Sequence, residues 1–538
     1  MFFLTDFLSK ILSKAHRQLR FSKVNIFYFF ACAWGIWLRL ELLEDRGQNY
    51  EIDQAVILYE GIKAWTEGRF QILGSEFTHW EMLMSYLAGG VDLLGWNPQW
   101  VPFWLSLVEI LLLGIFVART IGCAWFFPGL ALLMLNPWHL YYSSIVGTCV
   151  AAGVWILLSL LTPYSMSMSI GFRAFGLFHY SSTRIFIFAE FCWALFRREW
   201  RWVSISLGSF GCFFASVLLT QPEFFQHAIF RGGAQMKLPD YDFFWSPLRG
   251  LFFLWTPAFE KWVPWLQQNS DMEVSRALIE WLPPYELPLT WPGSILFSLG
   301  LWRLFNDTKI RGAILDLVLA RLRFLLILSV FILSPVASFT HWLWMLPFLT
   351  WLMLLGVRDL KPLYSHGLLA GTLLWMGISS SLLLQKAAEG HPRDFFSARI
   401  PEAIRLMNAK VSANHIDSVL PRFIVSPHAF VEVRYWALKF DNLKVLFVQQ
   451  PDLMAQQMRL SLQQANSPEQ AKGREAWILI DRFSDPDARA RNMPGVARLS
   501  AWTHDWTEFL RRHAMILEEV NLPGAVSESL LLKIRWQE

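Results

Sequence analysis

The segment between the first apolar run and the next carries several carboxylates close to the expected edge of a membrane. Asp53 lies in an amphipathic stretch that opens with Tyr50-Glu51-Ile52-Asp53-Gln54-Ala55 and ends with Glu67-Gly68-Arg69-Phe70. A charged side chain is costly in a water-poor site, so a carboxylate kept there indicates a role. An enzyme that acts on a lipid-linked substrate would need one at the outer mouth of a helical bundle. Asp53 is the first candidate, with Glu51 and Asp45 behind it, and the alternative is a carboxylate that only stabilises a helix N-terminus.

Composition indicates that membrane-spanning elements position this segment. Of the 538 residues, 54% are hydrophobic, 16% are aromatic and only 17% are charged, and the mean hydropathy is +0.34. Soluble domains carry about 25% charged residues. The 29 Trp and 45 Phe fit aromatic belts at two membrane interfaces. A net charge of +4 without a basic stripe argues against nucleic-acid binding.

Apolar runs long enough to cross a bilayer predict a helical polytopic bundle of about eleven spans. The expected spans are 24–43, 100–119, 121–141, 148–163, 165–180, 184–198, 202–220, 291–306, 322–339, 342–357 and 366–385. Residues 80–96 are also apolar but contain Glu81, Gly89, Gly90 and Asp92. We expect them to form an interfacial helix on the outer face.

Basic residues set the expected orientation. Residues 1–23 are a basic N-terminal segment that we expect to stay in the cytoplasm ahead of an uncleaved signal anchor. With eleven spans, the predicted inner turns are basic and the acidic segment around Asp53 lies outside. The inner basic residues are Arg119, Arg197, Arg198, Arg201, Lys309, Arg311, Arg321, Arg323, Arg358 and Lys361.

Charge also divides the chain into domains. The 153 residues from Lys386 onward hold 38 of its 90 charged side chains. We therefore expect a membrane domain at 24–385, with outer loops 44–99 and 221–290, and a soluble extracytoplasmic α/β domain at 386–538. The loop 221–290 is rich in Pro and Trp, which suggests a lid or a substrate-facing loop, with interfacial packing as the alternative. In the tail, strands are predicted at Arg422–Val425, Lys444–Val448 and Ala476–Ile480 and helices at Phe430–Phe440 and Asp452–Ala465, which favours a partly parallel sheet.

Five short motifs occur at consistent depth along the apolar part of the chain. They are Asp53-Gln54-Ala55 followed by Gly61 and Gly68, Thr78-His79-Trp80-Glu81, Asn136-Pro137-Trp138-His139-Leu140-Tyr141-Tyr142-Ser143-Ser144, Gly176-Leu177-Phe178-His179-Tyr180-Ser181-Ser182-Thr183-Arg184, and Thr340-His341-Trp342-Leu343-Trp344-Met345-Leu346-Pro347. In this order they resemble the C-type, polyprenyl-phosphate-dependent integral-membrane glycosyltransferases. That group includes protein O-mannosyltransferases and the aminoarabinose transferases of lipid A. The resemblance covers roughly residues 24–360.

The chain departs from the pattern of these relatives at several positions. Gln54 stands where a second acid is common, and the proline of a His-Pro-like turn near His79 is absent. Ser144 and Thr148 stand where many relatives carry an arginine and then an acid. His341 replaces a common arginine.

The resemblance implies transfer of a hexosyl or pentosyl group from a polyprenyl phosphate to an extracytoplasmic hydroxyl of a lipid, polysaccharide or protein. It also implies a bacterial inner-membrane protein of cell-envelope glycoconjugate synthesis. Phosphate is a good leaving group, so the site needs a base for the incoming hydroxyl and cations for the phosphate. Asp53 is the expected base, with inversion at the anomeric carbon. The expected substrate-binding residues are Arg184, His341, His79, Glu81, Arg231 and Glu223, with Lys237 as a reserve cation.

The chemistry does not require a metal, although a carboxylate and phosphate oxygens could recruit a divalent cation. Two other classes stay open. A transporter or flippase would place ionisable groups near mid-membrane and show inverted repeats. The sequence instead predicts acids and bases at the outer rim, and we find no repeat. A non-catalytic envelope-assembly protein that kept the fold is the other alternative, favoured by Ser144 and Thr148.

Overall fold

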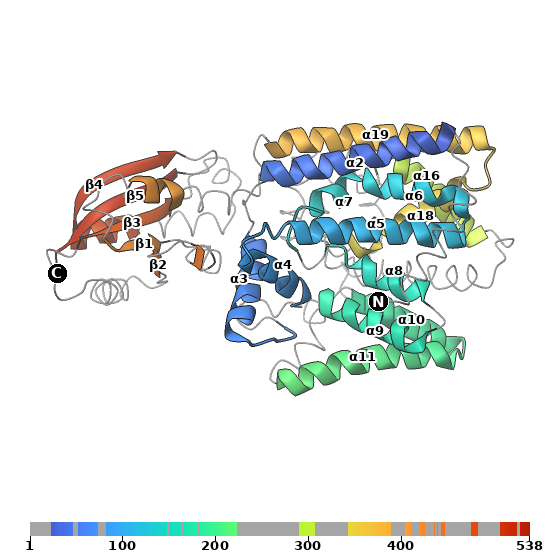
Figure 1. The fold of residues 1–538 in the computed structure, drawn as a ribbon, viewed down its shortest axis with the longest axis horizontal. Coiled ribbons are helices and arrows are strands. Elements are labelled where there is room, and N and C mark those ends of the chain that lie inside the picture. Colours follow the sequence, from blue (N-terminus) through green and yellow to red (C-terminus); the bar gives the residue numbers. More distant parts are fainter. Residues whose placement is uncertain are drawn as a thin grey trace, which may run out of the picture. The chain divides into compact units, whose positions relative to one another are not determined.

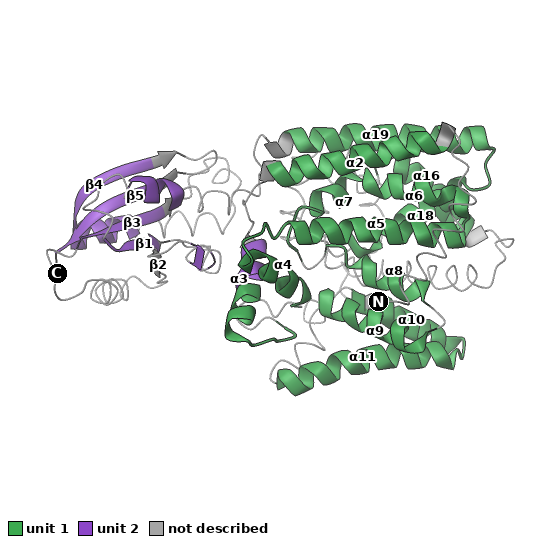
Figure 2. Ribbon diagram, in the orientation of Figure 1, with its two compact units in different colours: residues 1–47, 60–389 green, residues 48–59, 390–538 purple. Residues whose placement is uncertain are grey.

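The structure, a computed structural model, falls into two compact units. Unit 1 comprises residues 1–47 and 60–389 and unit 2 comprises residues 48–59 and 390–538 (Figure 2). The residues that the structure describes are 23–46, 52–73, 82–147, 150–162, 165–180, 183–222, 290–306, 343–388, 404–410, 420–425, 435, 438–439, 443–446, 475–482, 506–523 and 528–537.

Unit 1 is a helical bundle in which α2 and α19 lie side by side and α4 lies across one end (Figure 1). The helices of the chain are α2 (Lys23–Arg46), α3 (Ile52–Glu67), α4 (Leu83–Leu93), α5 (Trp100–Thr120), η1 (Cys123–Trp125), α6 (Phe126–Met134), α7 (Pro137–Tyr142), α8 (Gly153–Leu161), α9 (Met166–His179), α10 (Thr183–Phe196), α11 (Trp200–Thr220), α16 (Trp291–Asn306), α18 (Leu346–Val357) and α19 (Pro362–Ala388). Helix α3 begins in unit 2 and ends in unit 1.

Four of the described helices are long and apolar enough to cross a membrane unaided. They contain Asn25–Glu44, Trp100–Thr120, Trp200–Thr220 and Pro362–Gln385. Shorter apolar helices occupy Cys123–Met134, Phe186–Phe196 and Leu343–Val357. The predicted span 322–339 lies outside the described residues, so a total of eleven spans stays a prediction.

The span predicted at 121–141 is wrong as a single helix. Helix α6 ends at Met134, and a new helix, α7, begins at Pro137. The Asn136 side chain accepts a hydrogen bond of 2.9 Å from the His139 backbone N–H, and Pro137 occupies the first helical position. An Asn cap followed by Pro is a helix-start signal, and here it outweighs a continuous apolar run.

Helix α18 is the centre of the bundle. All of its residues from Leu346 to Val357 are buried. A helix that is apolar on every side could also face lipid, but burial of every residue shows that other parts of the chain surround α18. Phe348 packs edge-on against Phe116 of α5, and the Trp351 indole N–H donates a 2.8 Å hydrogen bond to the Thr120 hydroxyl. Helices α5 and α18 are thereby joined at buried residues.

Unit 2 contains a five-stranded mixed sheet of order β2-β1-β3-β5-β4. Its strands are β1 (Arg422–Val425), β2 (Leu443–Leu446), β3 (Glu475–Arg482), β4 (Ala514–Pro523) and β5 (Glu528–Trp536). Strand β1 pairs in parallel with β2 and β3, and β5 pairs antiparallel with β3 and β4. The three predicted strands are present as β1, β2 and β3, with ends that differ by at most two residues. The two antiparallel strands were not predicted, and the predicted helices at 430–440 and 452–465 lie largely outside the described residues.

Alternate residues of β3 build the core of this sheet. Ala476, Ile478 and Ile480 are buried with Trp506 and Leu510 in one apolar cluster. Side chains of a strand alternate between the two faces of a sheet, so one face of β3 supplies this cluster. On the other face, the Lys533 ammonium lies 5.9 Å from the centre of the Trp477 ring.

Candidate functional site

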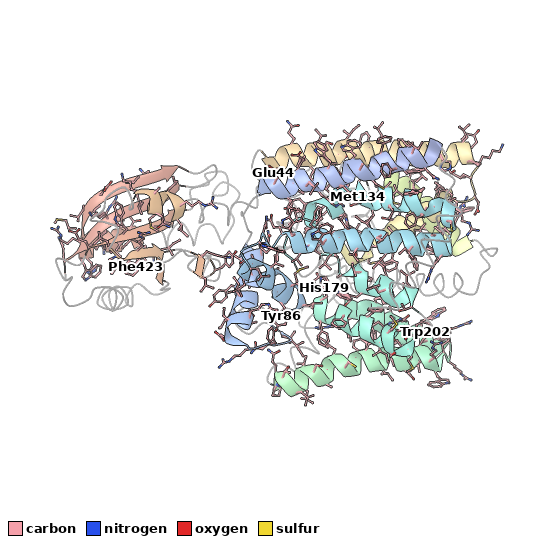
Figure 3. All side chains as sticks on the ribbon, in the orientation of Figure 1. Glu44, Tyr86, Met134, His179, Trp202 and Phe423 are labelled. Carbon is pink, nitrogen blue, oxygen red and sulfur yellow. The ribbon has the colours of Figure 1, made fainter. Side chains whose placement is uncertain are left out.

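Several chain segments meet at one end of unit 1, which we call the α4 end. Figure 3 shows Glu44, Tyr86 and His179 toward this end of the unit and Trp202 toward the opposite end. At the opposite end, the Tyr28 hydroxyl lies 2.9 Å from His366 Nδ1, and Trp125 stacks on the same imidazole. Helices α2, α6 and α19 therefore begin at the opposite end of the bundle.

Asp53, the predicted base, is the second residue of α3. Its position in the first turn places a carboxylate where the helix dipole favours negative charge. The amphipathic stretch of the sequence is helical from Ile52 to Glu67. Asp53 belongs to unit 2 and Arg184 belongs to unit 1. Asp53 is placed only through its backbone, so its predicted role stays a prediction.

The segment 80–96, predicted as an interfacial helix, contains α4, which crosses the second half of α3 at very close range. Its place at a membrane interface stays a prediction. A Cβ on Gly61 would collide with the Ser85 carbonyl, and a Cβ on Gly89 would collide with the backbone of Gly61. Only a pair of glycines allows two helix backbones to approach so closely. Gly61, one of the two glycines of the Asp53 motif, therefore has a packing role: it allows α3 to lie directly against α4.

Tyr86 of α4 contacts the end of α3 and the residues that follow it. Its hydroxyl donates to the Gln71 carbonyl, its backbone carbonyl accepts a 2.9 Å hydrogen bond from the Trp65 indole, and its ring packs edge-on against Phe70. Burial, together with the nearby Glu60 carboxylate, raises the pKa of Tyr86 to about 12. The phenol therefore stays protonated and keeps its role as a donor. Glu60 is itself buried, and sequence reasoning missed it.

Gln221, just after α11, holds the next residues of the same segment. Its side-chain oxygen accepts hydrogen bonds of 2.9 Å from the backbone N–H groups of Ile72 and Leu73, and its amide nitrogen donates 2.8 Å to the Leu73 carbonyl. The buried amide thus pairs with this backbone as a neighbouring strand would, although Ile72 and Leu73 lie 149 and 148 positions earlier in the chain. This contact fixes the end of α11 at the α4 end.

Arg184, the predicted phosphate ligand, is the second residue of α10 and is half-buried. Its guanidinium carbon lies 4.9 Å from the centre of the buried Phe213 ring of α11. Thr183 beside it donates 2.9 Å to the Gly176 carbonyl and 2.7 Å to the Tyr180 carbonyl, which ties the start of α10 to the end of α9. The other predicted ligands, His341, His79, Glu81, Arg231 and Glu223, lie outside the described residues.

A row of three ionisable side chains crosses the interior of the bundle. Arg39 of α2 donates to the Met134 carbonyl, and its Nη2 lies 2.8 Å from His139 Nδ1. His139 Nε2 lies 3.0 Å from Glu109 Oε2 of α5. All three side chains are buried. With the histidine proton on Nε2, the imidazole accepts from the guanidinium and donates to the carboxylate, so the row is neutral overall.

A second buried pair joins α9 to α10. Arg173 donates from Nε and Nη2 to the two carboxylate oxygens of Glu190, each at 2.8 Å, and neither side chain is exposed. The guanidinium also lies 5.3 Å from the centre of the Trp202 ring. A forked pair of this kind satisfies both planar groups at once.

These two networks contradict the expectation that acids and bases gather at the outer rim. Glu109, Arg173 and Glu190 lie inside apolar helices. A lone carboxylate in the run Trp100–Thr120 was a visible signal, because an ionisable residue in a span implies a buried partner. The partner of Glu109 comes from α7, and the arginine behind that histidine comes from α2, so spacing in the sequence could not reveal the network.

The Glu109 carboxylate leaves no room for a side chain at Gly153, the first residue of α8. A Cβ on Gly153 would collide with Glu109 Oε1 and press on the Trp344 carbonyl. We expect Gly153→Ala to lower the free energy of unfolding by about 1–3 kcal/mol, measured by reversible denaturation in detergent.

A matched substitution tests the cause of that effect. A Cβ on Gly171 of α9 meets no atom within 4 Å. Gly171→Ala should therefore stabilise the protein by about 0.5–1 kcal/mol, because alanine favours the helix. Equal effects at the two glycines would show that the Glu109 contact is not tight.

No metal-binding cluster is present among the described residues. Within this part of the chain, no group of three or more His, Cys, Asp or Glu side chains is placed to hold an ion.

The chain shares its fold with solved structures of a C-type glycosyltransferase. The solved structures that share this fold include those of ArnT from Cupriavidus metallidurans, the aminoarabinose transferase of lipid A. The structure bound to undecaprenyl phosphate has a TM-score of 0.56 and 9% identity, over 93% of this chain and 97% of ArnT. The apo structure has a TM-score of 0.50 and 10% identity, over 92% of this chain and 96% of ArnT. No protein-family model and no curated protein matches the sequence. The predicted resemblance is thus confirmed for the fold.

Proposed function

We propose that this chain is a membrane glycosyltransferase. It moves a sugar from a polyprenyl phosphate to a hydroxyl acceptor on the extracytoplasmic side of the bacterial inner membrane. The observation that carries the proposal is the shared fold with ArnT, which was crystallised with undecaprenyl phosphate, over 93% of this chain. The N-terminus is cytoplasmic in this proposal, and the α4 end and the C-terminal sheet face outward, as the positive-inside pattern predicts.

The reaction requires one base and one anion ligand. The acceptor hydroxyl attacks the anomeric carbon in line, Asp53 takes its proton, and the bond to the phosphate oxygen breaks with inversion. The phosphate departs as polyprenyl phosphate, and Arg184 neutralises its developing charge with a planar fork of donors. Support for these roles comes from the first turn of α3, which carries Asp53, and from the first turn of α10, which carries Arg184. The sugar, the acceptor and a divalent cation are left open.

The buried charges do not favour a transporter. Ionisable residues inside spans are the usual mark of an ion pathway. Here Glu109 and Glu190 are each paired with a buried base, and their side chains are almost completely shielded from solvent. Ion pairs that are shielded from solvent in this way join neighbouring helices and do not line an ion pathway.

A donor panel tests the proposal directly. The purified chain in nanodiscs is supplied with radiolabelled hexoses and pentoses on polyprenyl phosphate, together with an extract of envelope lipids and polysaccharides. The proposal expects release of polyprenyl phosphate from at least one donor, with label moving to the acceptor fraction. Movement of an intact donor between leaflets, without release, would support a flippase instead. Absence of release from every donor would contradict the transferase.

Arg184 gives a prediction for donor binding. Arg184→Gln should raise the KM for the donor by about 10- to 100-fold, because a hydrogen bond to a charged group is worth about 1.5–3 kcal/mol. Arg184→Lys keeps the positive charge but loses the two parallel donors of the guanidinium. Its KM for the donor should therefore lie between the values of wild type and Arg184→Gln. Arg201→Gln in the first turn of α11 is the matched control and should leave the KM unchanged. An unchanged KM for the donor in Arg184→Gln would contradict a role of this arginine in donor binding.

A further inference from the structure

The turn between α10 and α11 carries a dense set of basic and aromatic side chains at the opposite end of the bundle from α4. It sets three arginines against one glutamate, in the sequence Phe196-Arg197-Arg198-Glu199-Trp200-Arg201. Phe196 is 80% exposed and Trp200 is 66% exposed, and all three arginines are exposed as well. We call residues 196–201 the basic corner. Trp202, the next residue, is labelled at this end of the unit (Figure 3).

The backbone of the basic corner is fixed by the two helices that it joins. The Glu199 N–H donates a 2.8 Å hydrogen bond to the Ala194 carbonyl of α10. The Glu199 carbonyl in turn accepts a 3.2 Å hydrogen bond from the Val203 N–H of α11. Ala194, Trp202 and Val203 are buried together in one apolar cluster. The exposed side chains of the corner therefore stand on a packed base.

Arg198 occupies a position at which a helix end usually carries glycine. Its φ is 57°, in the left-handed region, just after the last turn of α10. A residue with a Cβ is disfavoured in this region because the Cβ approaches the following carbonyl oxygen. Glycine would close the same turn without that cost. The arginine is kept here against a backbone preference, which indicates that its charge has a use.

The charges of the basic corner are not neutralised as they are in another turn at the same end. Just before α19, Asp359 Oδ2 lies 2.8 Å from Arg303 Nη1, and Asp359 Oδ1 lies 3.1 Å from Arg358 Nε. Among the residues that the structure describes, no carboxylate forms an ion pair with Arg197 or Arg198. These two exposed charges are therefore available to an anion from outside the chain.

We propose that the basic corner binds the headgroup of an anionic phospholipid such as phosphatidylglycerol. Guanidinium donors match the oxygens of a phosphate, and an anionic membrane surface attracts each arginine near it. Phe196 and Trp200 can contact the adjoining acyl chains, because aromatic side chains favour the boundary between headgroups and hydrocarbon. The leaflet is the cytoplasmic one in the orientation proposed above. The site involves no sugar donor, so it is independent of the transferase reaction.

Thermal unfolding in detergent measures this binding, because a ligand of the folded protein raises its melting temperature. The full chain is titrated with phosphatidylglycerol or with phosphatidylcholine, which carries a phosphate but no net charge. For wild type, we expect a larger rise with phosphatidylglycerol, and a smaller difference between the two lipids at high ionic strength. Equal effects of the two lipids on wild type would overturn the proposal.

Soluble glycerol phosphate shows whether the ligand is a lipid. It supplies a phosphate anion without acyl chains, so it should raise the melting temperature far less than phosphatidylglycerol does. A rise as large as that with phosphatidylglycerol would assign the corner to a free phosphate compound and contradict a lipid site.

A pair of arginine substitutions locates the site. Arg197→Gln with Arg198→Gln should raise the apparent Kd for phosphatidylglycerol by about 30-fold, or about fivefold for each arginine. The matched control is Arg511→Gln with Arg512→Gln, which removes two adjacent exposed arginines from unit 2 and changes the net charge equally. Its Kd should stay at the wild-type value. Equal weakening in the two double variants would show a general effect of charge and contradict a site at the corner.

Arg198→Gly separates lipid binding from the stability of the turn. Without lipid, this variant should melt no lower than wild type, because glycine adopts a left-handed φ without strain. Its apparent Kd for phosphatidylglycerol should still rise about fivefold. A lower melting temperature without lipid, together with an unchanged Kd, would show that Arg198 serves only the turn and would contradict its role in lipid binding.

Discussion

Asp53→Asn is expected to lower kcat for sugar transfer by about 10²- to 10⁴-fold, the usual contribution of a general base. Asparagine has nearly the shape of aspartate but cannot take the proton of the acceptor hydroxyl. Asp53 is the second residue of α3, so the loss of charge at the helix N-terminus should cost only about 0.3–1 kcal/mol of stability. The measurement is release of polyprenyl phosphate in single-turnover conditions, alongside a melting curve.

Glu51→Gln provides the matched control for that substitution. It removes a carboxylate two positions away and leaves Asp53 in place. Turnover close to wild type is expected for this variant. If Asp53→Asn turned over as fast as wild type, Asp53 would not be the base, and loss in Glu51→Gln alone would transfer the role to Glu51.

Glu190→Gln is expected to produce the largest loss of stability, about 3–5 kcal/mol. The substitution removes the carboxylate that pairs with the buried Arg173 guanidinium. The two side chains are now joined by two hydrogen bonds of 2.8 Å and are fully shielded from solvent. Reversible denaturation in detergent would measure the change.

A double variant shows whether the loss comes from the orphaned charge. Replacing both partners, Arg173→Met with Glu190→Leu, should recover most of the stability, because a well-packed apolar pair can substitute for a buried ion pair. A single variant as stable as wild type would mean that Arg173 finds another neutralising partner. If the double variant were as unstable as the single one, the loss of free energy of unfolding would come from packing and not from the unpaired charge.

The helices of the bundle could largely be predicted, because each apolar run carries its own evidence. The break at Asn136-Pro137 was missed although its signal was local, since hydropathy runs unbroken across it. The end of α10 was placed correctly within two residues by the charged run at Arg197 and Arg198. In unit 2, β4 was missed because a bulge between Ile516 and Glu518 interrupts its alternation of faces. In β5, the adjacent residues Leu530, Leu531 and Leu532 are all buried, so residues on both faces are apolar and the run does not alternate.

The site was less predictable than the fold. Glu109 is visible as a lone acid in an apolar run, but its partner His139 lies 30 residues later in the chain. Arg39, which contacts the other side of that histidine, lies 70 residues before Glu109. No sequence motif marks Gln221, whereas in the structure its side chain binds the backbone of Leu73. Interactions of this kind depend on which helices pack together. One sequence gives no direct sign of that packing.

The lipid that co-purifies with the chain tests the central claim most directly. Mass spectrometry of lipids extracted from purified Asp53→Asn should find a polyprenyl phosphate with its sugar still attached, because binding is kept while transfer is blocked. Wild type should carry polyprenyl phosphate without the sugar. The absence of any polyprenyl phosphate from both proteins, each shown to be folded by its melting curve, would contradict the account.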